Sequence, residues 1–255
     1  MSLVNRKILV IVEGERKELN LVGRLRELFM PQNISIASYG TSLYKLYDNL
    51  VDCSDCNFED LDLLLVLKEH EPVVEKKAVF DEKYTDILLI FDFDPQDEKF
   101  DIEKIRKLMS YFNDSTDNGK LYINYPMVES FYHLANVREV MVDENFKDSK
   151  FTFQELVEHK YKRRVVIEGT DLDIKRMPKE QVENIMYQQV CKSNYILDGN
   201  YKVLEDYSQE KMLMLLDKQN NLLIHEGEAY VLNTCSFFVL EFYPSNVDFM
   251  KNFNE

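Results

Sequence analysis

Acidic side chains follow two apolar segments of the chain, at the points where predicted strands end. The run from Lys7 to Val12 leads into Glu13, and the run from Asp86 to Phe91 leads into Asp92 and Asp94. Ligands of open α/β sheets bind at the carboxyl ends of parallel strands. Carboxylates gathered at that edge repel one another unless a cation lies between them. The pattern therefore predicts a Mg²⁺ or Mn²⁺ site and chemistry on phosphate, because Mg²⁺ prefers carboxylate, water and phosphate oxygens as ligands.

The spacing of the two aspartates indicates how they would bind a cation. Side chains two residues apart on a strand point to the same side, so Asp92 and Asp94 can face one ion. Glu13 would join them or act as a general acid/base, and Asp97 would be an outer ligand. An alternative remains open, because an Asp-Phe-Asp segment also caps helices or is simply solvated. Both strands are apolar throughout, so we expect them to be parallel neighbours with their acids at one edge of the sheet.

The periodicity of apolar residues predicts the elements that hold these side chains. Strand-like and helical segments alternate in the first half of the chain, which predicts an α/β fold with a mostly parallel, Rossmann-like sheet flanked by helices. The expected strands are 7–13, 34–39, 86–91 and 121–124, and the expected helices are 15–30, 43–51, 58–70, 101–112 and 128–136. Further on, 153–161, 178–193 and 206–226 are predicted helices, and 236–240 is strand-like. We expect an α/β domain over residues 1–145 and a mainly helical C-terminal region over 146–255 packed on it.

Three short motifs resemble those of the Toprim domain of topoisomerases, primases and OLD-type nucleases. That domain carries a glutamate after its first strand and a DxD motif after a later one, as Glu13, Asp92 and Asp94 do here. The segment from Asn124 to Leu134 resembles the NP-x-x-E-x-x-x-x-H block of the RloB-like stand-alone Toprim proteins of bacterial defence loci. The similarity covers about residues 6–136. One departure is that Pro and Gln follow the DxD motif, where many Toprim sequences have a glycine.

The resemblance implies catalytic roles for the three acids, with Asp97 and Glu129 as further metal ligands. Glu129 and His133 are four residues apart on a predicted helix and would therefore share one face of it. His133 and Glu18 would support the metal ligands without binding the ion themselves. A buried polar pair that fixes the helix to the sheet is the alternative. Arg16 and Lys17, at the start of the first helix, would contact phosphate or be ordinary solvated residues.

The charge of the chain limits how it would meet nucleic acid. The formal net charge is −15, which argues against nucleic-acid binding by bulk electrostatics alone. A basic run lies at 160–164, and within it Arg163 and Arg164 are candidate nucleic-acid contacts, with a solvated helix face as the alternative. Cys53 and Cys56 form a CxxC pair, for which reduced thiols are favoured over a zinc or redox role. No apolar run is long enough to span a membrane, so we expect a cytoplasmic protein.

The leading hypothesis is a Mg²⁺-dependent nuclease that acts on DNA or RNA. The family resemblance implies an effector of antiphage defence that works with an ATPase partner, and a homo-oligomer is an open possibility. The main alternative is a degenerate Toprim domain that acts as a non-catalytic sensor or scaffold. A phosphatase of the haloacid dehalogenase type is less favoured. In that class the DxD motif follows the first strand and a Thr or Val stands where Gln96 is here.

Overall fold

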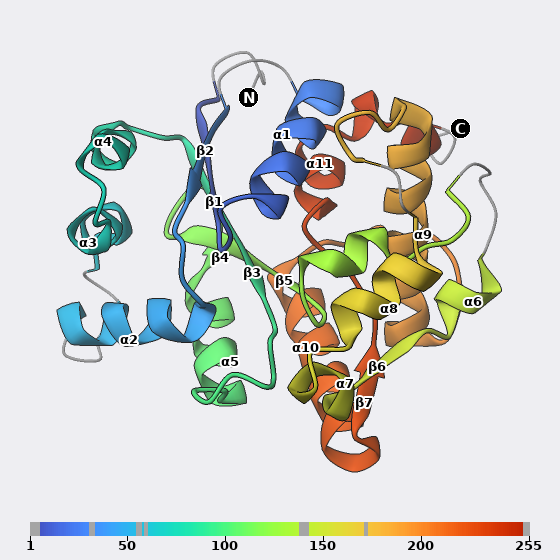
Figure 1. The fold of residues 1–255 in the computed structure, drawn as a ribbon. Coiled ribbons are helices and arrows are strands. Elements are labelled where there is room, and N and C mark those ends of the chain that lie inside the picture. Colours follow the sequence, from blue (N-terminus) through green and yellow to red (C-terminus); the bar gives the residue numbers. More distant parts are fainter. Residues whose placement is uncertain are drawn as a thin grey trace.

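A five-stranded sheet forms the centre of the molecule (Figure 1). The structure is a computed structural model that describes residues 6–30, 34–54, 58, 61–137, 143–170 and 173–251. The strand order is β2-β1-β3-β5-β4, and the first four strands in that order are parallel. Their bounds are β1 (Ile8–Val12), β2 (Ile34–Ser38), β3 (Asp86–Asp92) and β5 (Gly119–Asn124), with β4 (Asn113–Asp114) antiparallel at the edge. The predicted α/β fold with a mostly parallel sheet is confirmed.

The two strands that lead into the acidic residues are neighbours. β1 and β3 pair in parallel, with Val12 opposite Ile90, so Glu13 reaches the same edge of the sheet as Asp92. This confirms the expected arrangement. From β1 the chain first crosses to β2 on one side, and β3 then lies on the other side. The acids therefore lie where the strand order reverses, which is where open α/β sheets bind their ligands.

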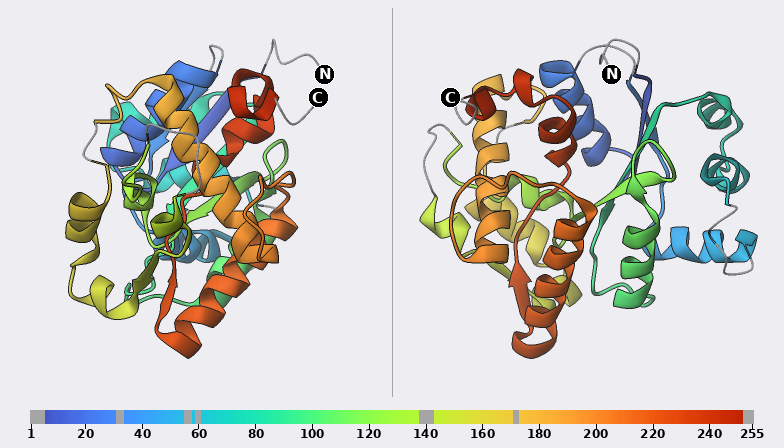
Figure 2. Two further views of the ribbon diagram at one scale, coloured as in Figure 1. Left: turned by 90° about the vertical axis from the view of Figure 1, so that its right-hand side faces the viewer. Right: turned by 180° about the vertical axis from the view of Figure 1, so that it is seen from behind.

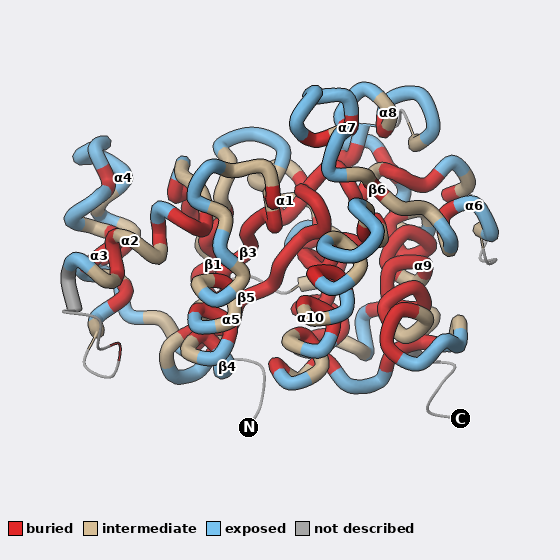
Figure 3. The backbone as a smooth tube through the Cα atoms, turned by 90° about the horizontal axis from the view of Figure 1, so that it is seen from below, coloured by how far each residue is buried: buried red, intermediate tan, exposed pale blue. Residues whose placement is uncertain are grey.

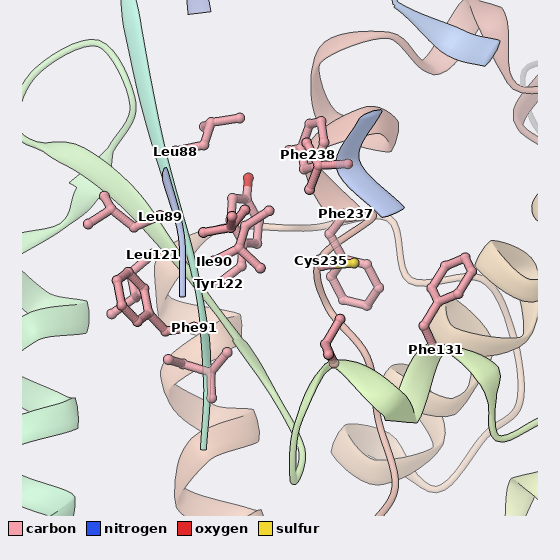
Figure 4. Close-up of a cluster of buried hydrophobic side chains, with 14 of the residues drawn as sticks. Leu88, Leu89, Ile90, Phe91, Leu121, Tyr122, Phe131, Cys235, Phe237 and Phe238 are labelled. Carbon is pink, nitrogen blue, oxygen red and sulfur yellow. The ribbon is translucent and has the colours of Figure 1, made fainter. Parts of the chain in front are cut away.

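Helices cover both faces of the sheet (Figures 1 and 2). On one face lie α1 (Lys17–Phe29) and α11 (Phe237–Phe242), and on the other lie α2 (Leu43–Ser54), α3 (Leu63–His70) and α5 (Ile102–Tyr111). Because helices lie on both faces, the central strands are buried, whereas the outward faces of the helices are exposed (Figure 3). The close-up shows Leu88 and Ile90 directed toward Phe237 and Phe238, and Leu89 on the opposite side of β3 (Figure 4). This alternation explains why a continuously apolar strand suits a sheet that is covered twice.

The region after residue 143 is mainly helical, as predicted. Besides α11, its α-helices are α6 (Glu144–Lys147), α7 (Phe153–Val157), α8 (Tyr161–Glu168), α9 (Lys179–Asp198), α10 (Gln209–Glu226) and α12 (Asp248–Lys251). In this region β6 (Lys150–Thr152) and β7 (Glu228–Tyr230) pair as a small antiparallel sheet, which brings the segment before α7 next to the segment after α10. Backbone hydrogen bonds in both directions between Tyr125 and Leu232 connect this region to the end of β5. The C-terminal part therefore packs directly beside the edge of the sheet that carries the acids.

Three predicted elements differ from the structure. The helix expected at 128–136 is a short 3₁₀ helix, η3 (Val128–Tyr132), and the strand-like patch at 236–240 lies in α11. The helix expected at 153–161 is broken between α7 and α8, where His159 has a φ of 55°. Short apolar runs do not distinguish strand from buried helix, which explains the second error. The prediction also missed the strands β4, β6 and β7 and the helices α6, α8 and α12. It missed three further short helices as well, α4 (Val74–Lys77), η2 (Ala78–Asp81) and η4 (Pro244–Asn246).

The end of α8 packs tightly against η3 at Gly169. A methyl group there would collide with the carbonyl oxygen of Tyr132 and lie 2.6 Å from that of Val165. We expect Gly169→Ala to lower the free energy of unfolding by about 1–3 kcal/mol, measured by chemical denaturation. Gly23 in α1 has open space at the same position, so Gly23→Ala should instead stabilise the protein by about 0.5–1 kcal/mol. A Gly169→Ala protein as stable as wild type would contradict this packing.

Candidate functional site

Glu13 is held against the end of β3. Its backbone N–H donates to the carbonyl of Ile90 at 3.2 Å, and its carbonyl accepts from Gly40 at 2.9 Å. Its carboxylate Oε2 accepts a hydrogen bond from the backbone N–H of Asp92 at 3.0 Å. The side chain thus lies between the ends of β1 and β3. A residue that follows a buried strand is given this position by backbone pairing alone, which is why the sequence predicted it.

Asp92 is the last residue of β3 and is 7% exposed. Its Oδ1 accepts a hydrogen bond from Nδ2 of Asn124 at 3.2 Å. Asn124 ends β5 and is fully buried, and the strand register places it directly opposite Asp92. The sequence prediction did not include Asn124 in the site, although a buried polar residue at the end of an apolar strand was the available signal.

Asp94 is positioned by a turn and not by strand alternation. β3 ends at Asp92, and Asp94 has a φ of 37°, in the left-handed region that aspartate and asparagine tolerate. Its N–H donates to the carbonyl of Pro126 at 3.1 Å, and its Oδ1 accepts from Nε2 of Gln96 at 3.0 Å. The argument that residues two apart share a side is therefore wrong here, because the second aspartate lies beyond the strand.

Burial and mutual repulsion disfavour negative charge at this edge. Burial, and then repulsion from Asp94, raises the pKa of Glu13 to about 8. Burial raises the pKa of Asp94 to about 6, against the hydrogen bond from Gln96. Burial, and then the charges of Glu13 and Asp94, raises the pKa of Asp92 well above its ordinary value. The three acids therefore form one electrostatic unit that gains stability from protons or from a bound cation.

Glu18 approaches the same site from the first turn of α1. Its carboxyl group lies where a methyl group on Gly14 would be, so glycine at that position gives the carboxylate room. Burial, together with repulsion from Glu129, raises the pKa of Glu18. The charge of Glu18 thus acts on Glu13, and its predicted supporting role stays a prediction.

Glu129 contacts two lysines. Its Oε1 lies 2.8 Å from Nζ of Lys17 and 3.3 Å from Nζ of Lys162. Burial alone would raise the pKa of Glu129, but the hydrogen bond from Lys17 and the charge of Lys162 outweigh it and lower that pKa. The carboxylate is therefore ionised and engaged by ammonium groups. Its predicted role as a metal ligand stays a prediction, and in this structure its partners are lysines.

His133 contacts residues of α8 and not Glu129. Its Nδ1 lies 3.2 Å from the hydroxyl of Tyr161, and its Nε2 lies 3.1 Å from a carboxylate oxygen of Glu168. The expectation that Glu129 and His133 share a helix face is wrong, because η3 ends at Tyr132 and a 3₁₀ helix has three residues per turn. His133 instead ties η3 to α8.

The remaining predicted site residues are Asp97 and three arginines, and their environments in the structure differ. Asp97 is partly exposed and accepts a hydrogen bond from the N–H of Lys99, while its charge acts on Glu13. Arg16 and Arg163 are exposed. Arg164 is held by Glu155, with both carboxylate oxygens at 2.8 Å from Nη1, so its guanidinium is already engaged. Besides Asn124, the sequence prediction did not assign Lys162 to the site, although Lys162 lies within the basic run that it noted.

The oxygen atoms of this site are of the kind that a hard cation binds, but the side chains are not grouped as a preformed cation site. The acids and the Asn124 amide offer the oxygen ligands that Mg²⁺ and Mn²⁺ bind. Within the described ranges, however, no three His, Cys, Asp or Glu side chains are grouped so that they could hold a metal ion. Glu13 has its carboxylate turned to the backbone of β3.

Comparisons of the chain with protein-family models, with curated proteins and with solved structures found no match. The helices that the structure describes include none both long and apolar enough to cross a membrane. The Cys53–Cys56 pair lies outside the residues whose side chains are described, whereas Cys191 and Cys235 are buried free thiols. The function is therefore inferred from the site itself and from the motifs described above.

Proposed function

We propose that the protein is a Mg²⁺- or Mn²⁺-dependent nuclease that cleaves phosphodiester bonds of DNA or RNA. The observation that carries the proposal is the charge of the site. Glu13, Asp92 and Asp94 meet at the point where the strand order reverses, and burial and repulsion raise the pKa of each. Buried carboxylates with perturbed pKa values in such a position are typical of functional sites. The resemblance to Toprim motifs independently favours phosphoryl chemistry at the same three residues.

Each residue has a role that follows from its position. A bound divalent cation would polarise a phosphoryl oxygen and lower the pKa of a water molecule. Asp92 and Asp94 are the residues that would hold it. Glu13, with a pKa near neutrality, would bind the cation when ionised or accept and return a proton at its carboxylate. Asn124 orients Asp92, and Lys17 at the start of α1 would contact phosphate oxygens.

The wider context of the proposal rests on the resemblance to stand-alone Toprim proteins of defence loci. We propose on that basis an effector of antiphage defence that works with an ATPase partner, and we expect it to act in the cytoplasm. The partner would also supply what the chain lacks, because a net charge of −15 repels a polyanion at long range.

Cleavage is expected to be weak in the isolated chain and strong when the products of neighbouring genes are present. The test combines the chain with those products, Mn²⁺ or Mg²⁺, and single- and double-stranded DNA and RNA. Glu13→Ala should abolish cleavage and leave complex formation intact, since Glu13 acts on the substrate and not on assembly. Equal cleavage by wild type and Glu13→Ala would contradict the proposal.

A second candidate is a degenerate site in a sensor or scaffold. The observation that favours it is that no three-ligand metal group is preformed among the described side chains. A competent site should stabilise the fold on binding Mn²⁺, because the ion binds only the folded state. An unchanged melting temperature at saturating Mn²⁺, with no cleavage in the complex, would favour the scaffold.

A further inference from the structure

Two lysines from distant parts of the chain meet beside the acidic site. Lys17 belongs to α1, and Lys162 belongs to α8 in the C-terminal region. Both ammonium groups lie against one oxygen of Glu129, at 2.8 Å and 3.3 Å. The Glu129 side chain is 5% exposed, whereas those of Lys17 and Lys162 are 54% and 65% exposed. The carboxylate is thus enclosed, and the two cations lie between it and the solvent.

Counted over direct contacts alone, the two lysines exceed their carboxylate partner by one charge. One carboxylate faces two ammonium groups, so Glu129 balances only one of them. Burial alone would lower the pKa of Lys162, but the charges of Glu129, Asp94 and Asp92 together outweigh it and raise that pKa. Lys162 is therefore a fixed cation within electrostatic reach of the candidate metal ligands. An exposed lysine pair of this kind suits a phosphate anion, for which lysine acts as a point charge.

The position of Lys162 is set by contacts of α8 with η3, the segment that carries Glu129. His133 contacts Tyr161 and Glu168 at the two ends of α8. The backbone N–H of Thr170 donates to the carbonyl of Tyr132 at 2.9 Å. Gly169 allows the close approach between α8 and η3 described above. These contacts lie outside the acidic site, and their common effect is to fix α8 against η3.

We infer that α8 completes the site, with Lys162 and Lys17 as a phosphate-binding pair that Glu129 holds in place. The inference rests on the proposed function and adds to it a residue from the C-terminal region. The ligand is a phosphodiester or another phosphate group next to the scissile position. The alternative is that Lys162 only balances the charge of Glu129. Exposed ion pairs contribute little to stability, so the protein would still fold without Lys162, and in that case its substrate binding would be unchanged.

The test compares Lys162→Gln with Lys7→Gln, both made in the chain carrying Asp94→Asn, so that substrate is not consumed, and assembled with the products of the neighbouring genes. Lys7 is a suitable control because it is also partly exposed and ion-paired, with Glu82, at the opposite edge of the sheet. Affinity for a short labelled oligonucleotide is measured over a range of salt concentrations. Lys162→Gln should weaken binding about 10-fold and reduce the salt slope by about one, while Lys7→Gln leaves the slope unchanged.

Inorganic pyrophosphate, titrated calorimetrically, serves as a second probe that does not depend on nuclease activity. Weaker pyrophosphate binding in Lys162→Gln than in Lys7→Gln supports the phosphate site even if no cleavage is found, in which case only the proposed function fails. Equal effects of the two substitutions, or a parent protein that binds neither probe, would overturn the inference. Normal cleavage with an unchanged KM in Lys162→Gln, with Asp94 intact, would overturn it and leave the proposed function standing.

Discussion

Asp94→Asn is expected to reduce metal-dependent cleavage by at least about 10²-fold, because it removes one charge from the ligands of the proposed ion. The substitution isolates that charge. Asparagine tolerates the left-handed backbone that Asp94 adopts, and its amide oxygen can still accept the hydrogen bond from Gln96. Folding should therefore be preserved. The measurement is the cleavage rate of the chain with its partner at saturating Mn²⁺.

A matched control comes from β4, the outermost strand on the side of the sheet away from β2. Asp114 accepts hydrogen bonds from the N–H and hydroxyl of Thr116, at 2.8 Å and 2.7 Å, through a single carboxylate oxygen. Asp114→Asn keeps those contacts and changes the net charge by the same amount. It should leave the rate within about twofold of wild type, because distant exposed charges are screened by salt. Similar losses in both variants would mean that net charge, and not a metal site, explains the effect of Asp94→Asn.

The strands and the acids that follow them could be predicted from the sequence because local information determines them. A run of aliphatic residues identifies β1 and β3, and parallel pairing then places Glu13 and Asp92 at one edge. Asn124 follows the same rule at the end of β5 and could have been included. The part of the site that lies on strand ends is therefore accessible to reasoning from pattern alone.

The rest of the site depends on turns and on packing between distant segments. The φ of Asp94 is set by the turn that follows β3 and is not encoded in strand periodicity. Lys162 reaches Glu129 only because α8 docks on η3, and this contact joins two separate regions of the chain. The helix expected around Glu129 ends early, so spacing along the sequence gave the wrong partner for His133. Such contacts follow from tertiary structure, which pattern reasoning does not reach.

Stability without metal should fall as pH rises from about 5.5 to 8, and Glu13 should account for much of the fall. Its folded pKa of about 8 exceeds the ordinary 4.5, so between these values the folded state holds a proton that the unfolded state has lost. The resulting stabilisation is complete below about pH 4.5 and disappears as pH approaches 8. Asp94, with a pKa of about 6 against 3.8, acts in the same direction over a lower range.

Glu13→Gln separates this contribution from those of the other titrating groups. Glutamine stays neutral and can still accept the hydrogen bond from the N–H of Asp92. The loss of unfolding free energy between pH 5.5 and 8, measured by denaturation in EDTA, should be smaller in the variant by on the order of 2 kcal/mol. Effects of buried groups elsewhere, such as Lys192, are common to both proteins and cancel. A pH dependence that is the same in both proteins would mean that Glu13 is not the protonated group.

Metal should reverse the same trend, because a cation takes the place of the protons. Mn²⁺ binds the ionised carboxylates of the folded state, so its stabilising effect on wild type should be larger at pH 8 than at pH 5.5. At a concentration of about 100 times Kd the gain would be about 2.7 kcal/mol. Glu13→Gln should show a smaller gain at pH 8, since one anionic ligand is missing. If Mn²⁺ stabilises wild type and Glu13→Gln equally at both pH values, the ion binds elsewhere and the acids at the ends of β1 and β3 are not its site.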